Sequence, residues 1–169
     1  RVEEHGLSDL SEKLLYVDDV IVAFQSLAHH VAQEWGKPIV AITGSAGKTT
    51  AKEITSHVLE HGKRKVLKNE KNFNNGLGHP MTVLKLVKDD SYDIAVLEMG
   101  MSSPKREIAR LCEITPPDVS VVLNVLPVHV EHLGSIENVA KAKAEIVEGM
   151  KPGGTAVLNA DDNRVSEMG

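Results

Sequence analysis

The stretch that decides the fold is Ile39-Val40-Ala41-Ile42-Thr43-Gly44-Ser45-Ala46-Gly47-Lys48-Thr49-Thr50, which runs into an amphipathic segment ending near residue 61. An apolar run, a glycine-containing turn and a helical repeat predict a strand, a loop and a helix. The same alternation continues along the chain. Apolar runs predict strands at 39–43, 65–67, 94–97, 119–123 and 155–158, and helical spacing predicts helices near 48–61, 80–87, 104–113 and 136–150. This order is typical of an α/β fold: a mostly parallel sheet with helices on both faces.

The segment before residue 39 predicts one further helix. Asp18 or Asp19 can cap its start, and Gly36 with Pro38 ends it. Residues 14–17 are apolar enough for a possible short strand.

Composition excludes several classes of protein. The chain has 169 residues, a net charge of −5, and only one Trp, two Tyr and two Phe, which argues against a nucleic-acid binder. Its single cysteine, Cys112, allows neither an internal disulfide nor a CxxC zinc site. This cysteine usage suits a reducing compartment, so we expect a cytoplasmic location. No apolar run approaches the ~20 residues of a membrane span, so we expect no membrane association. The chain starts at Arg1 rather than Met and stops just after a strand-like run, so we expect it to be part of a longer protein.

The loop after the first predicted parallel strand predicts phosphate binding. Its glycines let backbone N–H groups approach phosphate oxygens, and the following helix adds its positive N-terminal end. Lys48 can reach the terminal phosphates of a nucleotide, and the Thr49 hydroxyl can bind Mg²⁺. Ile42 stands where the longer Walker pattern has glycine, so this is the shorter GxxGK[ST] variant. The predicted phosphate-binding residues are Gly44, Ser45, Ala46, Gly47, Lys48, Thr49 and Thr50.

Polar residues follow other predicted strands, at the sheet edge where ligands bind in such folds. Glu98 follows the run 94–97 and is a candidate Mg²⁺ ligand; the alternative is a solvated acid at a strand end. Asn124 follows 119–123 and can hydrogen-bond near the phosphates. His129 lies in the same loop and could ligate a metal or orient a substrate, although lone loop histidines are more often structural or exposed.

Lys143 lies on the predicted core-facing side of a helix whose start Ser135 can cap. An unpaired ammonium there is costly, so its amine either reaches a polar partner or serves a site. Burial lowers the pKa of a lysine. A neutral lysine amine can add CO₂ and become a carbamate, which is a metal-binding anion.

Two asparagine-bearing loops are weaker candidates. Asn74 and Asn75 lie in a polar loop after 65–67, and their amides suit an amide- or phosphate-rich ligand. Asn159 follows the run 155–158 and could hold a nucleotide base or ribose. The alternatives are an ordinary loop and an ordinary strand-to-helix turn.

Taken together, these motifs resemble the Mur ligase family, ATP-dependent amide-forming enzymes of bacterial cell-wall synthesis. The resemblance runs from about Leu14 to Asn163. It rests on Ile42-Thr43-Gly44-Ser45-Ala46-Gly47-Lys48-Thr49-Thr50, Asn72-Phe73-Asn74-Asn75, Leu97-Glu98-Met99-Gly100, Asn124-Val125-Leu126-Pro127-Val128-His129, Ala142-Lys143-Ala144-Glu145-Ile146 and Leu158-Asn159-Ala160-Asp161-Asp162.

The resemblance implies roles for single residues. Lys48 and Thr49 would hold the ATP phosphates and Mg²⁺. Glu98 and His129 would bind magnesium, and Lys143 would be a carbamylated lysine that bridges to a second magnesium. The residues implied near the remaining ligands are Asn74 and Asn75 for the muramoyl-peptide and Asn159 for the adenine.

The resemblance also implies an activity. The sequence looks most like the branch that adds D-alanyl-D-alanine to UDP-N-acetylmuramoyl-tripeptide through an acyl phosphate, as a monomer. Residues 1–17 would end an N-terminal substrate domain and 18–169 would belong to the ATP-binding central domain, with the C-terminal domain absent. We expect such a piece to bind ATP weakly at best and not to turn over. The sequence departs from the family at Ala46, where the usual Asn and its phosphate-side contact are absent. It also departs at 76–79 and 101–103, so the family's substrate contacts are not carried over to those residues.

Three alternatives remain open from the sequence. One is a sister ligase, such as the enzyme that adds the third amino acid, or a folylpolyglutamate synthetase. A second is a P-loop switch NTPase, although no NKxD base-recognition motif for GTP occurs. A third is a non-catalytic interaction domain that keeps the fold.

Overall fold

The computed structural model describes residues 13–101, 105–128 and 133–169. Its centre is a sheet of five parallel strands in the order β2-β3-β1-β4-β5. The strands are β1 (Ile39–Thr43), β2 (Val66–Lys68), β3 (Ile94–Glu98), β4 (Val119–Val122) and β5 (Thr155–Leu158). All four strand pairings are parallel. The predicted α/β class is therefore confirmed, and each predicted strand lies within one residue of its observed bounds.

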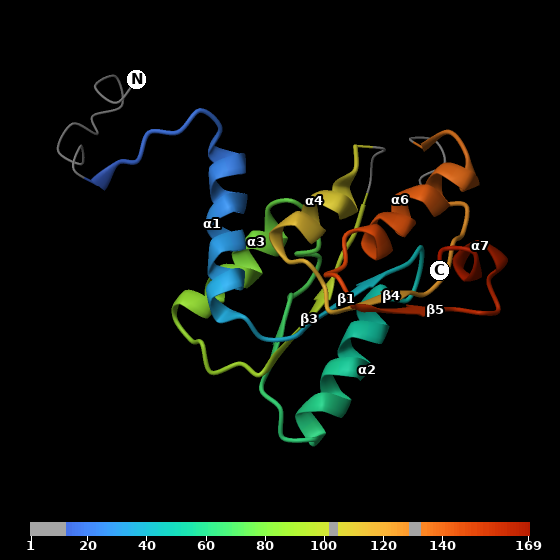
Figure 1. The fold of residues 1–169 in the computed structure, drawn as a ribbon, viewed down its shortest axis with the longest axis horizontal. Helices are drawn as coiled ribbons and strands as arrows, with labels where there is room; N and C mark the ends of the chain where they lie inside the picture. Colours follow the sequence, from blue (N-terminus) through green and yellow to red (C-terminus); the bar gives the residue numbers. More distant parts are fainter. Residues whose placement is uncertain (1–12, 102–104, 129–132) are drawn as a thin grey trace.

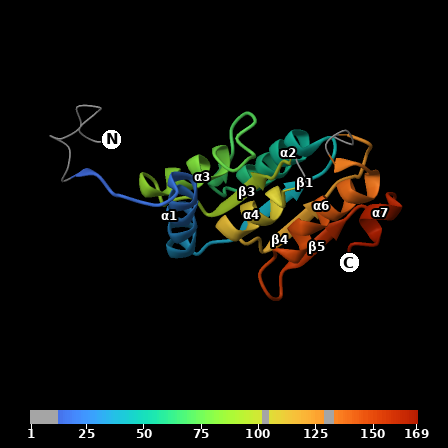
Figure 2. The same cartoon turned by 90° about the horizontal axis from the view of Figure 1, so that it is seen from above.

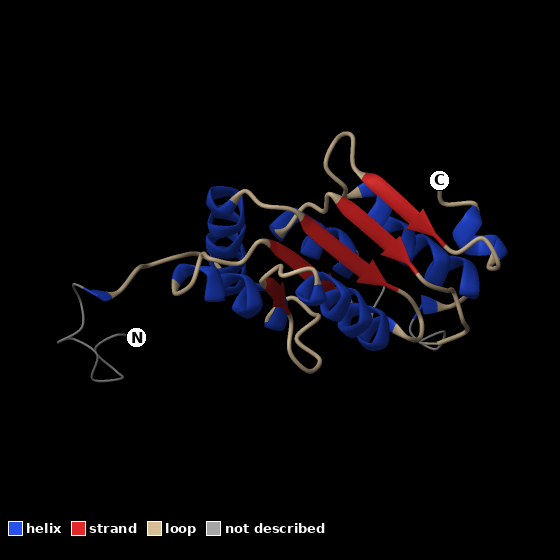
Figure 3. Ribbon diagram, turned by 90° about the horizontal axis from the view of Figure 1, so that it is seen from below, coloured by secondary structure: helices blue, strands red, loops and turns tan. Residues whose placement is uncertain are grey.

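Helices cover both faces of the sheet (Figures 1 and 2). Helix α2 (Lys48–His61) packs on one face, where Ile42, Val66 and Val96 are buried. Figure 3 looks onto this face. On the other face lie α1 (Val20–Trp35), α3 (Gly78–Val83), α4 (Glu107–Ile114) and α6 (Ile136–Glu148), with the 3₁₀ turn η2 (Leu84–Val87) and the short α7 (Asn163–Ser166).

The larger core lies between the sheet and this second group of helices. It contains the alternate strand residues Ile39, Ala41, Ala95, Leu97 and Val122. Because successive strand side chains point to opposite faces, the two-sided covering explains why these runs are almost continuously apolar.

The predicted caps at the ends of α1 and at the start of α6 are confirmed. Asp19 caps α1, and its carboxylate accepts from the N–H groups of Ile21 at 2.7 Å and Val22 at 3.0 Å. Gly36 ends the helix with φ +63°. Ser135 caps α6 through the N–H of Asn138 at 3.2 Å.

Three element predictions need correction. Residues 14–17 form no strand, since no neighbouring strand pairs with them, and Leu15 and Tyr16 are exposed. The segment predicted as one helix at 80–87 begins at Gly78 and tightens into the 3₁₀ turn from Leu84. The helix predicted from 104 begins at Glu107, and residue 104 itself lies outside the described residues. Within the described part of the chain, no helix is long and apolar enough to cross a membrane.

Candidate functional site

The loop of residues 44–47 connects the end of β1 to the start of α2, as the sequence predicts. We call it the phosphate loop after its predicted role. Gly47 caps the helix with φ +80°, a conformation that favours glycine. At Gly44, an added Cβ would lie 2.9 Å from the Leu123 Cβ, so a side chain would force the loop away from β4. Lys48 donates from Nζ to the Gly44 carbonyl at 2.8 Å and so curls back over the loop. The first N–H groups of a helix have no acceptor within it, which suits this turn to an anion.

Asn124 braces the loop from the end of β4. Its side-chain oxygen accepts from the Ala46 N–H at 2.9 Å, and its Nδ2 donates to the Ala46 carbonyl at 3.2 Å. Its carbonyl accepts from the Ser45 N–H at 3.0 Å, and the Ser45 hydroxyl bonds to Leu126. Asn124 therefore lies at the phosphate loop, where the sequence places it, with its amide paired to the loop backbone.

The Glu98 side chain bonds to residues of two different segments, the first turn of α2 and the loop that carries Asn74. It ends β3 and is only 3% exposed. Thr49 Oγ1 donates to Glu98 Oε2 at 2.8 Å, and Asn74 Nδ2 donates to Glu98 Oε1 at 2.6 Å. Both hydrogen-bond donors are uncharged groups. The alternative of a solvated strand-end acid is wrong, because the side chain is buried.

Lys143 on α6 is 2% exposed, which confirms its predicted inward orientation. Within the described residues, no hydrogen bond or ion pair reaches its amine. Burial, with a smaller contribution from the nearby charge of Lys48, lowers the pKa of Lys143 to about 8. The amine therefore loses its proton at a lower pH than an exposed lysine does, and the charge of Lys48 is close enough to contribute to this shift.

Of the remaining predicted residues, two are held by hydrogen bonds to the backbone, one is exposed and one lies outside the described residues. Asn75 Oδ1 accepts from the N–H groups of Leu77 at 3.1 Å and Gly78 at 2.9 Å, so it organises the start of α3. Asn159 donates to the Leu123 carbonyl at 2.8 Å and stands beside the strand that leads to Asn124. Thr50 is exposed on the first turn of α2, and His129 lies outside the described residues.

The donor set near Glu98 fits Mg²⁺. Magnesium prefers oxygen ligands and is usually held by one or two carboxylates together with substrate phosphates. The Glu98 carboxylate and the Thr49 hydroxyl oxygen, which lie within hydrogen-bond distance of each other at the start of α2, are oxygen ligands of this kind. The described residues contain no group of three or more His, Cys, Asp or Glu side chains that could hold a metal unaided. A metal at Glu98 would therefore need ligands beyond these side chains, such as phosphate oxygens.

A cavity of about 540 Å³ adjoins the segment that carries Asn74. Asn74, Asn75 and Gly100 line it together with Gln25 and Arg110. The Asn74 side chain therefore lies between this cavity and the Glu98 carboxylate. A ligand here would lie beside the Asn74 side chain, in a cavity that both Arg110 and Glu107 line.

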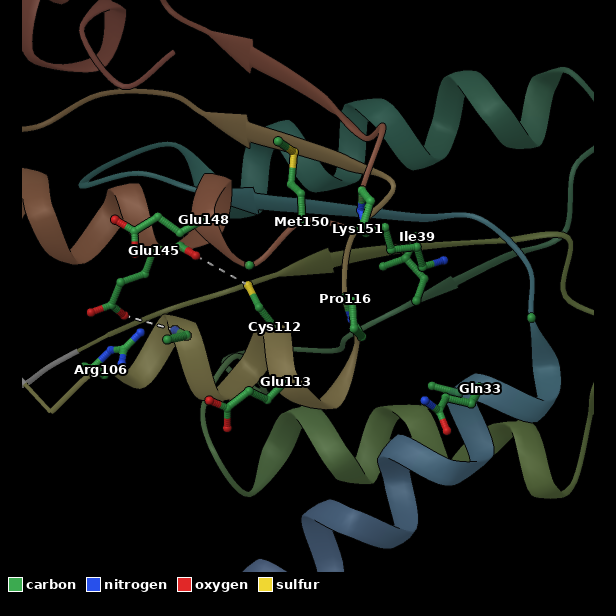
Figure 4. Close-up of a pocket in the computed structure, with 15 residues that line it drawn as sticks. Gln33, Ile39, Arg106, Cys112, Glu113, Pro116, Glu145, Glu148, Met150 and Lys151 are labelled. Carbon is green, nitrogen blue, oxygen red and sulfur yellow. Dashed lines mark hydrogen bonds between the residues drawn. The ribbon is translucent and has the colours of Figure 1, made fainter.

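A second cavity, of about 720 Å³, lies at the opposite end of the sheet (Figure 4). It is lined by Ile39 at the start of β1 and by Pro116 and Lys151, which precede β4 and β5. Glu145 and Cys112 also face it, and burial raises the pKa of the Cys112 thiol to about 12. Because the phosphate loop follows the carboxyl end of β1, this cavity belongs to a different part of the molecule.

Sequence reasoning missed two buried residues behind the site, Lys52 and Asn69, each 1% exposed. Lys52 follows Lys48 by one helical turn, and Asn69 is the first residue after β2. The strand-end rule that identified Glu98 and Asn124 applies equally to Asn69 and could have found it.

Comparisons with known proteins agree with this geometry. The profile of the Mur ligase middle domain matches residues 42–168. The UDP-N-acetylmuramoyl-tripeptide–D-alanyl-D-alanine ligase of Bacillus subtilis (strain 168) is 42% identical over 149 residues, which cover 88% of this chain and 32% of that protein.

Solved structures give the same result. The MurF ligase of Thermotoga maritima in complex with ADP superposes with a TM-score of 0.86 at 36% identity, covering 93% of this chain and 36% of that one. MurF from Acinetobacter baumannii superposes with a TM-score of 0.85 at 31% identity, covering 91% of this chain and 33% of that one. The chain spans about a third of the length of the relatives it matches.

Proposed function

The chain belongs to the Mur ligase family, and from this premise we propose that the full-length protein joins D-alanyl-D-alanine to UDP-N-acetylmuramoyl-tripeptide at the expense of ATP, in peptidoglycan precursor synthesis. One observation carries the proposal. The buried carboxylate of Glu98 is held between Thr49 of the phosphate loop and Asn74, which lines the adjoining cavity. The predicted phosphate loop and this cavity would thus lie on either side of one carboxylate. Phosphoryl transfer requires such closeness of ATP and substrate.

The phosphate loop would bind ATP. Lys48, which donates to the Gly44 carbonyl in the free loop, would turn to the terminal phosphates. Residues 44–50 would supply N–H groups, and Asn124 would keep the loop in shape through its two bonds to Ala46. Asn159, whose side chain bonds to the Leu123 carbonyl, would contact the adenine.

Thr49, Glu98 and His129 would hold Mg²⁺, with Lys143 as a carbamate at a second ion. When bound, the metal would neutralise charge on the transferred phosphoryl group. The chain itself contributes a buried, pre-oriented carboxylate, because the hydrogen bonds from Thr49 and Asn74 restrict its rotation.

The carbamate that we propose for Lys143 is supported by the chemistry of its amine. With a pKa of about 8, roughly a tenth of the amine is neutral at pH 7. The nitrogen lone pair would attack the carbon of CO₂, form an N–C bond and release a proton, which turns a cation into an anion beside Lys48. Carbon-13 NMR of the protein in labelled bicarbonate tests this without turnover. A carbamate signal is expected in the wild type and not in Lys143→Met, whereas no signal in either would exclude the modification.

The reaction would proceed in two transfers. A carboxylate oxygen of the tripeptide attacks the γ-phosphorus, ADP leaves, and an acyl phosphate forms. The amine of D-alanyl-D-alanine then attacks the acyl carbon, an amide bond forms, phosphate leaves, and the amine proton passes to solvent or a base. The protein mainly positions the reactants and stabilises the charge on the transferred group.

The test is an assay of the full-length protein with ATP, Mg²⁺, UDP-N-acetylmuramoyl-tripeptide and D-alanyl-D-alanine. Phosphate release should require both acceptor substrates, and oxygen-18 in the tripeptide carboxylate should appear in the released phosphate. Lys48→Met should abolish release, while Lys63→Met, at an exposed position, should not. Phosphate release that is independent of the tripeptide would contradict the proposal.

The same assay separates the alternatives. A sister ligase would use UDP-N-acetylmuramoyl-dipeptide with a single amino acid, and a folylpolyglutamate synthetase would use a folate with glutamate. A switch NTPase would hydrolyse nucleotide without either acceptor and would tolerate Lys143→Ala, whereas the ligase should lose activity and regain part of it with acetate. A non-catalytic domain would keep its function after Lys48→Ala.

We further propose that the enzyme works in the cytoplasm as a monomer. The single, buried Cys112 suits a reducing compartment. Sedimentation of the full-length protein at two concentrations tests the monomer.

A further inference from the structure

We propose that Asn69 is a positioning residue: its side-chain amide sets the place of Glu98 and, through the neighbouring loop, the place of the Asn74 amide that bonds to the Glu98 carboxylate. The inference rests on the proposed function, because Glu98 matters there as a magnesium ligand. Asn69 hydrogen-bonds to Lys52, Phe73 and Glu98, and it is not among the residues that line the adjoining cavity.

The first part of the geometry is a two-point contact with the end of β3. Asn69 Oδ1 accepts from the Glu98 N–H at 2.9 Å, and Asn69 Nδ2 donates to the Glu98 carbonyl at 2.8 Å. The amide thus bonds to β3 beyond the last residue pair of the β2–β3 register, which is Lys68 with Val96. Two bonds to one residue fix both the position and the rotation of its backbone.

The second part of the geometry is a bond to the loop that carries Phe73 and Asn74. Asn69 Nδ2 also donates to the Phe73 carbonyl at 3.0 Å. The next residue, Asn74, donates to the Glu98 carboxylate at 2.6 Å, and its carbonyl accepts from the Gly100 N–H at 2.8 Å. One amide group therefore positions both the carboxylate and the side chain that orients it.

The third part ties this pair to the helix of the phosphate loop. Lys52 Nζ donates to the Asn69 carbonyl at 2.6 Å, and both residues are 1% exposed. Lys52 lies one turn after Lys48 on α2, the helix that carries Thr49. The backbone of Asn69 is thereby anchored to α2 while its side chain holds β3.

The chemistry of the three bonds requires an amide. Both N–H groups of Asn69 face carbonyl oxygens, and its oxygen faces an N–H. A carboxylate at this buried position would place an acceptor against two acceptors. A serine is too short to reach all three partners and would leave buried polar groups without bonds. Groups that orient a metal ligand typically contribute about 10- to 100-fold to metal affinity.

The experiment measures magnesium and nucleotide binding separately in the full-length protein. Calorimetry gives the affinity for ADP in EDTA, and a Mg²⁺ titration of the ADP complex gives the metal affinity. Asn69→Asp and Asn69→Ser should weaken Mg²⁺ binding about 10- to 100-fold and change metal-free ADP binding less than about twofold. The serine variant introduces no buried charge, so it serves where the aspartate variant fails to fold.

The matched control is Gln33→Glu, which makes the same amide-to-carboxylate change at an exposed position on α1, in the cavity at the opposite end of the sheet. It should leave both affinities unchanged. Glu98→Gln serves as the reference for the metal site itself and should weaken Mg²⁺ binding at least as much as the Asn69 variants.

The outcomes separate the two proposals. If Glu98→Gln weakens Mg²⁺ binding and folded Asn69 variants do not, the positioning role is overturned while the metal site stands. If the Asn69 variants weaken metal-free ADP and Mg²⁺ binding equally, Asn69 only supports the fold and the inference is again overturned. If Glu98→Gln has no effect on Mg²⁺, the metal assignment fails and the role of Asn69 fails with it.

Discussion

Replacing Lys143 with methionine should make the folded protein more stable at neutral pH. The side chain is 2% exposed, and burial, with a smaller contribution from Lys48, lowers its pKa from 10.5 to about 8. A lowering of this size corresponds to about 3 kcal/mol of unfolding free energy, since one pKa unit is worth about 1.4 kcal/mol. Methionine has a similar length and no charge, so it removes this penalty without opening a cavity.

The pH dependence has a definite sign. Between about pH 8 and pH 10.5 the unfolded chain holds a proton that the folded chain has released, so stability rises with pH across this window. Below about pH 8 both states hold the proton and the full penalty remains. The gain from Lys143→Met should therefore be about 3 kcal/mol at pH 7 and should shrink as the pH rises toward 10.5.

Urea unfolding of both proteins in CO₂-free buffer, at about pH 7 and about pH 10, measures the difference. Carbon dioxide is removed because a carbamate would replace the buried cation with an anion. Lys141→Met, at an exposed position on the same helix, is the control and should change stability by less than about 0.5 kcal/mol. The reasoning is refuted if Lys143→Met is no more stable than the wild type at pH 7, or if its gain is equal at both pH values.

Two substitutions and one labelling experiment test other parts of the fold. Gly44→Ala places a Cβ 2.9 Å from the Leu123 Cβ, so unfolding free energy should fall by about 1–3 kcal/mol and ADP affinity should drop in calorimetry. Burial lowers the pKa of His79 to about 4, so its protonation in the unfolded chain should reduce stability as pH falls from 6.5 to 4, and His79→Gln should lose this part of the dependence in urea unfolding. Cys112, with its pKa raised to about 12, should react with a thiol reagent at pH 8 only after unfolding, and rapid labelling of the native protein would contradict its burial.

Patterns that lie close together in the sequence predicted much of the fold. The five strands, the helix after the phosphate loop and the caps Asp19 and Ser135 all follow from short-range periodicity and capping chemistry. The failure at 14–17 has the same origin: a strand needs a partner, and four apolar residues do not say whether one is present.

The sequence predicted which residues belong to the candidate site better than it predicted which of them bond to one another. Glu98 and Lys143 were identified from a strand end and from a helix face, and both are buried as that reasoning implies. That Asn74 rather than Asn75 bonds to Glu98 depends on the path of the loop, since neighbouring asparagines are equivalent in sequence.

The sequence by itself determined the order of strands and helices, the glycine loop and the positions of the strand-end polar residues, because these depend on neighbours within a few positions. Only the tertiary structure decided that Thr49, Asn74 and Glu98 meet, that Asn69 supports them from behind, and by how much burial lowers the pKa of Lys143. Those facts depend on distances and solvent exclusion among residues from different elements, and hydrogen bonds and desolvation act only once the chain has brought such residues together.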